Sequence, residues 1–137
     1  FILFDNEEKG KLGSRAYFKE NKESIKNIPF INFDCVGNGN NIIFIAQKNA
    51  ESSKEFAILK ESFTPCEEFA VHFHGQRGSE ANSDHKSFPL GIACLASKST
   101  KRGILYTPNI HTSHDTVAHT ENITFITEEM VKFLKKL

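Results

Sequence analysis

The chain has 137 residues, a length typical of one domain, and its 17 lysine and arginine residues balance its 17 aspartate and glutamate residues. Zero net charge argues against nucleic acid or a membrane surface as the partner, and no apolar run approaches membrane-spanning length. Cys35, Cys66 and Cys94 are widely spaced and odd in number, so we expect reduced thiols in or near the core, with one disulfide as the lesser alternative. The compartment stays open, with the cytoplasm slightly favoured over secretion.

The first four residues are apolar, and such a short unbroken run is typical of a strand buried on both faces of a sheet. Because the run has no initiating Met, we expect sequence upstream of it to be missing. Glu7 and Glu8 follow the run, and open α/β sheets place their ligands beyond the carboxyl ends of the strands. Gly13 permits a tight loop, and Ser14 is expected to cap the next helix. A solvated acidic turn is the alternative for the two glutamates.

Apolar strand-like segments alternate with helical ones along the rest of the chain. The predicted strands cover residues 27–37, 41–46, 68–73, 90–96 and 103–106. An Asn-Gly-Asn turn between the first two of these predicts that they pair as neighbours. A polar loop is expected over residues 75–83. The alternation predicts an α/β fold in three layers, with a mostly parallel, mixed and twisted sheet between helices.

Helices are predicted over residues 14–21 and 52–63 and at the carboxyl end of the chain. In the first, Ala16 and Phe18 are candidates to face inward. Ser52 or Ser53 is expected to cap the second, whose apolar face is Phe56, Leu59 and Phe63. Asn122 or Thr127 is expected to cap the last helix, whose apolar stripe is Ile126, Met130, Phe133, Leu134 and Leu137.

Metal-ligand donors stand at separated points that each follow an apolar run: the Glu7–Glu8 pair, Asp34 and His111. Glu, Asp and His ligands suit a catalytic zinc site better than a structural one. Spacing alone leaves open that each is an ordinary surface or core residue. His72 and His74 are two residues apart on a predicted strand, so their side chains lie on the same face. They are interpreted either as an ordinary surface pair or as a fortuitous metal site.

Four strings occur in the order DNEEKGKLGS, NFDCVG, SDHKSF and IHTSHDT. Together they resemble the carboxyl-terminal half of the bacterial zinc aminopeptidases, metallopeptidase family 28, which also includes glutamate carboxypeptidase and glutaminyl cyclase relatives. The resemblance covers nearly the whole chain. It implies a zinc-exopeptidase fold that lacks its N-terminal part, with residues 1–137 forming the carboxyl-terminal part of the catalytic domain. It also implies two zinc ions at the carboxyl ends of the sheet strands.

The resemblance assigns roles residue by residue. Glu7 matches the general base that takes a proton from the zinc-bound water, and Glu8 matches a ligand of one zinc. Asp34 matches a ligand of the other zinc, and His111 matches a ligand of the same zinc as Glu8. Residues that would line the substrate pocket or support the ligands are Asp84, His85 and Asp115; His114 is not assigned to the metal.

The implied activity is hydrolysis of N-terminal residues from peptide substrates. The complete site of the family needs a further His and a bridging Asp, and no matching string is present in this chain. This chain would therefore carry part of the site. The alternatives are glutaminyl-cyclase-like or dipeptidase chemistry on the same scaffold, or an inactive binding or truncated domain. A homo-oligomer through an exposed sheet edge beside residues 1–4 is also expected.

Overall fold

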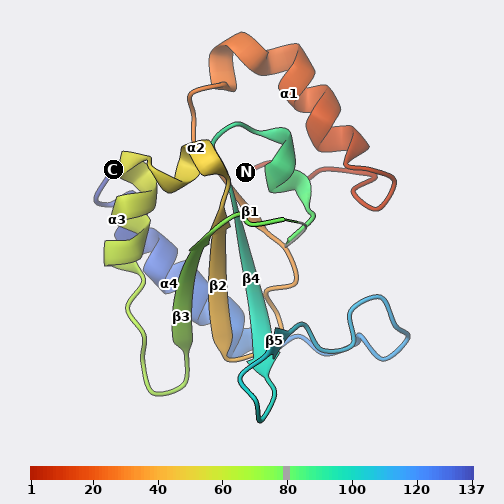
Figure 1. The fold of residues 1–137 in the computed structure, drawn as a ribbon, viewed down its shortest axis with the longest axis vertical. Coiled ribbons are helices and arrows are strands. Elements are labelled where there is room, and N and C mark those ends of the chain that lie inside the picture. The colour runs from red at the N-terminus through yellow and green to blue at the C-terminus, as the bar shows by residue number, and fades with distance from the viewer. Residues whose placement is uncertain (79–80) are drawn as a thin grey trace.

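The computed structural model describes residues 1–78 and 81–137 (Figure 1). The predicted polar loop includes residues 79–80, which lie outside the described residues. The helices are α1 (Leu12–Ile25), α2 (Lys48–Glu51), α3 (Lys54–Ser62) and α4 (Thr120–Leu134), with a 3-10 turn η1 (Asp84–Ser87). The strands are β1 (Phe30–Phe33), β2 (Asn41–Ala46), β3 (Ala70–Gly75), β4 (Gly91–Ser99) and β5 (Leu105–Tyr106). Among the described residues, no helix is both long and apolar enough to cross a membrane.

The strands form one mixed sheet in the order β1-β4-β2-β3, with β5 paired to β4. β1 runs parallel to β4 and β2 parallel to β3, whereas β2 and β4 are antiparallel. The predicted pairing of the first two strands is wrong, because β4 lies between β1 and β2 and takes the hydrogen bonds of both (Figure 1). The predicted α/β fold, with a mixed sheet flanked by helices, is confirmed.

The core lies on both faces of β2, all six residues of which are buried. Ile42 and Phe44 point to the larger cluster, which includes Phe56 of α3 and Phe133 of α4. The other face of β2 carries Ile43 and Ile45, which form a small cluster with Ala93 of β4 and neighbouring side chains. This burial on both faces explains the continuous apolar run of β2.

The stripe predicted for α3 is confirmed, because Phe56, Leu59 and Phe63 are all buried. Ser53 caps α3, since its Oγ accepts a hydrogen bond from Phe56 N at 3.1 Å. In α4 the residues Ile126 and Phe133 are buried and Met130 packs partly buried against the core. The inward placement of Leu134, Leu137 and Ala16 is wrong, because all three are exposed. The caps predicted for α4 are also wrong: the helix begins earlier, and Asn122 is a buried donor to Gly39 O.

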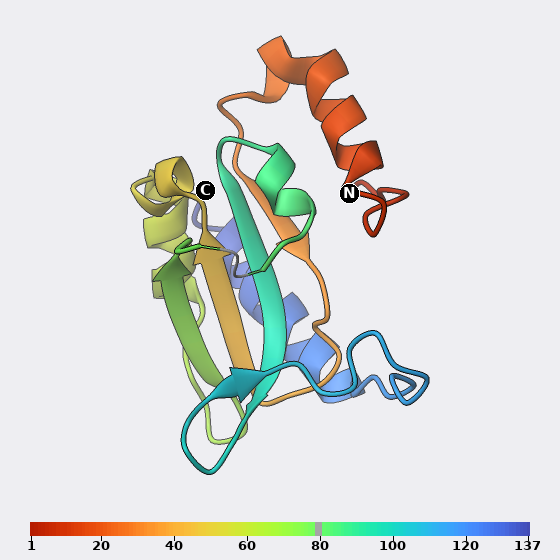
Figure 2. The ribbon, with the colours of Figure 1, turned by 45° about the vertical axis from the view of Figure 1, so that its right-hand side comes forward.

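The buried strand predicted for residues 1–4 is wrong. Within the described residues this segment pairs with no strand, and Leu3 is 99% exposed. Phe4 is anchored, because its ring packs against Tyr17, Phe30 and Phe88. In Figure 2 this end of the chain lies with α1 on the opposite side of the sheet from α3. Oligomerisation through a sheet edge stays a prediction.

The three cysteines are free thiols, as expected. Cys94 is fully buried on β4 and Cys35 is half-buried. The core placement of Cys66 is wrong, because this residue is exposed in the loop that precedes β3.

Candidate active site

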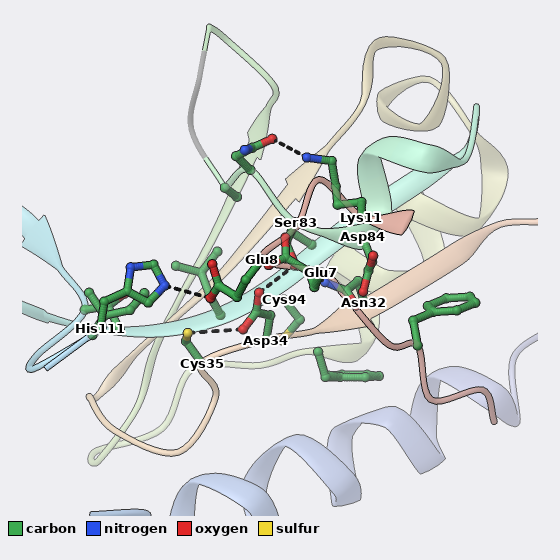
Figure 3. Close-up of a pocket in the computed structure, with 18 of the residues that line it drawn as sticks. Glu7, Glu8, Lys11, Asn32, Asp34, Cys35, Ser83, Asp84, Cys94 and His111 are labelled. Carbon is green, nitrogen blue, oxygen red and sulfur yellow. Dashed lines mark hydrogen bonds and ion pairs between the residues drawn. The ribbon is translucent and has the colours of Figure 1, made fainter. Parts of the chain in front are cut away.

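A cavity of about 880 Å³ opens beside β1 and β4. Four separate segments meet there: the loop before α1, the carboxyl end of β1, the loop before η1, and the loop after β5 (Figure 3). The acidic side chains that line the cavity are Glu7, Glu8, Asp34, Asp84 and Asp115. His111 and Lys11 also line it. The predicted catalytic and ligand residues, which are far apart in the sequence, therefore share one cavity.

The loop that carries Glu7 is held by backbone hydrogen bonds rather than by a strand. Glu7 O accepts from Lys11 N at 2.7 Å, and Asp5 O accepts from Gly13 N at 3.1 Å. Asn6 and Lys11 both adopt the left-handed region, with φ of 57° and 59°, which reverses the chain on either side of the glutamates. Gly13 is required for close approach, because a Cβ there would lie 2.6 Å from Asp5 O.

Ser14 ties this loop to the segment before β4. Its side chain is fully buried, and its Oγ lies 2.7 Å from Ser87 Oγ of η1. The predicted capping role is wrong, because Lys11 is the residue that precedes α1 and Ser14 lies inside the helix. Ser14 instead fixes the start of α1 against η1.

Asp34 directly follows β1, and its backbone N donates to Cys94 O of β4 at 3.1 Å. Its carboxylate is oriented by two hydrogen bonds: Ser83 Oγ donates to Oδ2 at 2.6 Å and Cys35 Sγ donates to Oδ1 at 3.1 Å. Ser83 Oγ in turn accepts from Asn32 Nδ2 at 2.8 Å. Burial, followed by the hydrogen bond and charge of Asp34, raises the pKa of Cys35 to about 12.

Sequence reasoning missed two residues of this network, Ser83 and Asn32. Asn32 precedes Asp34 by two residues, so the alternation of a strand places both on one side, and this spacing was the available signal. Ser83 was harder to find, because it is separated from Asp34 by 49 residues of sequence. The signal available for Ser83 was its position next to Asp84.

His111 reaches the cavity from the loop after β5, where its φ of 59° is left-handed. Its Nε2 lies 2.9 Å from Glu8 Oε1, and both side chains stay largely exposed, at 70% and 74%. The structure thus brings together the two side chains assigned to the same metal ion. Across residues 1–78 and 81–137, however, no three His, Cys, Asp or Glu side chains converge closely enough to hold a metal.

The electrostatics of the cavity favour a cation. The pKa of Glu7 is raised by burial and then by the negative charges of Glu8, Asp34 and Asp84, while Lys11 acts in the opposite direction. Asp84 is buried, and its Oδ1 has no hydrogen-bond partner in the described part of the chain. Crowded carboxylates with one orphaned oxygen would be stabilised by a divalent cation. The imidazole of His111 beside Glu8 adds the nitrogen donor that makes the set compatible with zinc.

The residues predicted to line the pocket or support the ligands differ in their position relative to the cavity. Asp84 and Asp115 line the cavity, and Asp115 is exposed. His85 lies outside the lining and is 0% exposed, with Nε2 3.2 Å from Gln76 Oε1. Burial, together with the charges of Lys86 and Lys11, lowers the pKa of His85 to about 4, so its ring is neutral near pH 7.

Fold and site together define an α/β domain whose acidic, cation-compatible cavity is built from loops around strand ends. The sequence profile of Peptidase family M28 matches residues 1–131, and the chain belongs to this family. Two crystal structures of the LapA aminopeptidase of Legionella pneumophila are similar in fold. Their TM-scores are 0.66 and 0.65, at 20% and 21% sequence identity over 97% of this chain. The chain covers 37% and 38% of the length of those two proteins. No curated protein matches the chain.

Proposed function

We propose that this chain carries part of the catalytic centre of a zinc aminopeptidase that removes N-terminal residues from peptides. The observation that carries the proposal is the convergence of Glu7, Glu8, Asp34 and His111 in one acidic cavity. Family membership and fold similarity to an aminopeptidase support the same reaction class. When bound, zinc supplies Lewis-acid activation of the attacking water and of the scissile carbonyl.

In this proposal Glu7 is the general base. Its raised pKa makes it a better proton acceptor than an ordinary exposed glutamate, and it is partly buried beside the cavity. Glu7 takes a proton from the attacking water and then returns one to the leaving amine. The peptide bond breaks, and Glu7 ends in its starting ionisation state.

Glu8 and His111 would hold one zinc ion, and Asp34 would hold the second. Ser83 and Asn32 orient the Asp34 carboxylate through the hydrogen-bond chain described above. Such supporting hydrogen bonds fix ligand geometry. The excess of carboxylates, which includes Asp84 and Asp115, would also attract the protonated amino terminus of a peptide.

The proposal concerns a site that this chain shares with further sequence. The chain spans under two fifths of the length of its structural neighbours. On the motif resemblance, residues 1–137 would form the carboxyl-terminal part of the catalytic domain. Assays therefore use the longest natural polypeptide that contains the chain. Two zinc ions per protein would support the aminopeptidase, whereas one would favour glutaminyl-cyclase-like chemistry.

The test is Glu7→Gln with Glu20→Gln as the matched control, because Glu20 is an exposed carboxylate of α1 outside the cavity. Hydrolysis of a leucyl anilide and zinc content are measured on the same samples. Loss of a general base lowers turnover by about 10²–10⁴-fold, so Glu7→Gln should lose activity by this amount and keep its zinc. Near-normal turnover of Glu7→Gln would refute the assignment of Glu7 as the base.

A further inference from the structure

Two histidines lie together on β3, away from the acidic cavity. β3 is the outer strand of the order β1-β4-β2-β3, and within the described residues it pairs only with β2 (Figure 1). His72 and His74 are in register with Ile43 and Ile45, so their side chains lie on the sheet face opposite α3 and α4. Their ring centroids are 6.3 Å apart and their planes differ by 8°.

The neighbouring Asn41 determines which ring nitrogen of His72 carries the hydrogen. Asn41 Nδ2 donates to the backbone carbonyl of Ser97 at 3.2 Å and to Asn40 Oδ1 at 3.0 Å. Because a backbone carbonyl only accepts hydrogen bonds, this contact fixes the orientation of the Asn41 amide. Asn41 Oδ1 therefore faces His72 Nε2 at 3.1 Å, and Nε2 must carry the proton. The lone pair of the neutral ring is left on Nδ1.

This arrangement is the one that metal-binding histidines use. A ligand imidazole commonly donates its other ring N–H to an oxygen acceptor, which fixes the ring and makes the free nitrogen more basic. Asn41 is buried, so this support is rigid, whereas His74 is exposed and can adjust its side chain. Two rings bonded to one ion at about 2.1 Å per bond have centroids no farther apart than about 6.5 Å. The observed 6.3 Å is near this limit and the ring planes are nearly parallel, so the exposed His74 must turn toward His72 for both rings to bind one ion.

We propose that His72 and His74 form a surface metal site that is separate from the catalytic cavity. Its ligand class is a divalent late first-row transition metal, bound by two imidazoles with water at the other positions. Imidazole suits Zn²⁺, Ni²⁺ and Cu²⁺, and Cu²⁺ forms the strongest complexes in this series. Two imidazoles are the protein ligands of this site, which leaves its other positions to water. The site is therefore weaker than one with three protein ligands.

The test is a Cu²⁺ titration, near pH 7, of the longest natural polypeptide that contains the chain, followed by NMR of the rings of this chain's six histidines. Paramagnetic Cu²⁺ broadens nearby resonances, and it broadens those of the rings that bind it most strongly and at the lowest Cu²⁺ concentration. Substoichiometric Cu²⁺ should broaden His72 and His74 before His119. His74→Ala should remove this broadening of His72 and weaken Cu²⁺ binding at the pair at least 10-fold. His114→Ala, which removes another exposed histidine, is the control and should leave the pair unchanged.

The measurement on the unaltered chain keeps the proposal falsifiable if a variant fails to fold. The proposal is overturned if His72 and His74 broaden no earlier than His119. It is equally overturned if folded His74→Ala gives the same broadening of His72 as the unaltered chain. The readout resolves each ring separately, so Cu²⁺ bound at His111 is not confused with Cu²⁺ bound at this pair.

Discussion

Replacing Gly13 by Ala tests whether the loop before α1 sets the positions of Glu7, the proposed general base, and Glu8, a proposed zinc ligand. A Cβ at residue 13 would lie 2.6 Å from Asp5 O and 2.9 Å from Asp5 N. Ordinary contacts begin near 3.4 Å, so the separation from Asp5 O must grow by about 0.8 Å. Both contacts are with backbone, and the loop itself must therefore move. Glu7 and Glu8 lie between these two points and are expected to shift with it.

Stability should change much less than activity. The hydrogen bond from Gly13 N to Asp5 O is weakened, at a cost of about 1 kcal/mol. Alanine is the better helix former by up to about 1 kcal/mol, which offsets this loss because residue 13 lies inside α1. A displacement near 1 Å at a catalytic group costs about 10²-fold in rate. We therefore expect kcat/KM to fall about 10²-fold while the free energy of unfolding changes by less than about 1 kcal/mol.

The assay compares Gly13→Ala with Arg15→Ala, an exposed substitution on the same helix. Peptidase activity gives kcat/KM, and urea denaturation followed by circular dichroism gives the free energy of unfolding. Activity of Gly13→Ala within twofold of the unaltered protein would refute the role of this close approach. A parallel loss in Arg15→Ala would show that any disturbance of α1 has the same effect.

Two further predictions concern stability. Ser53→Ala removes the cap of α3 and should lower the free energy of unfolding by about 1 kcal/mol in urea, whereas Ser52→Ala should change it less; equal effects would contradict the capping role. Burial lowers the pKa of folded His85 to about 4, below the ordinary value of 6.5, so protons bind preferentially to the unfolded chain. The stability that neutral His85 contributes is intact above pH 6.5 and is lost, by up to about 3 kcal/mol, as the pH falls from 6.5 toward 4. Between pH 6.5 and 4, the free energy of unfolding of His85→Gln should depend less on pH than that of the unaltered chain or of the exposed control His119→Gln. Equal pH dependence in all three proteins would contradict the account.

Local patterns predicted much of the fold. β2 and β4 were predictable because apolar β-branched and small residues run together and turn residues bound them. The face of α3 was predictable because Phe56, Leu59 and Phe63 repeat at helical spacing. Pairing order was not predictable, because the insertion of β4 between β1 and β2 depends on contacts over roughly 60 residues of sequence, which no local pattern encodes.

The start of the chain illustrates the limit of composition. Residues 1–4 have the composition of a buried strand, yet a strand needs neighbours for its hydrogen bonds, and none lies beside it in the described structure. In the site, the motif strings located Glu7, Glu8, Asp34 and His111 in the sequence. They did not indicate that Ser83 donates to Asp34, because that contact depends on how the loop before η1 folds against β1.

The zinc content of the protein tests the central claim most directly. His111→Ala and His114→Ala are compared in a His74→Ala background, which removes the surface pair from the metal count. Both residues lie in the same loop and are exposed, but only His111 contacts Glu8. The account predicts that His111→Ala loses zinc and leucyl-anilide hydrolysis while His114→Ala keeps both. Unchanged zinc content in His111→Ala would contradict it.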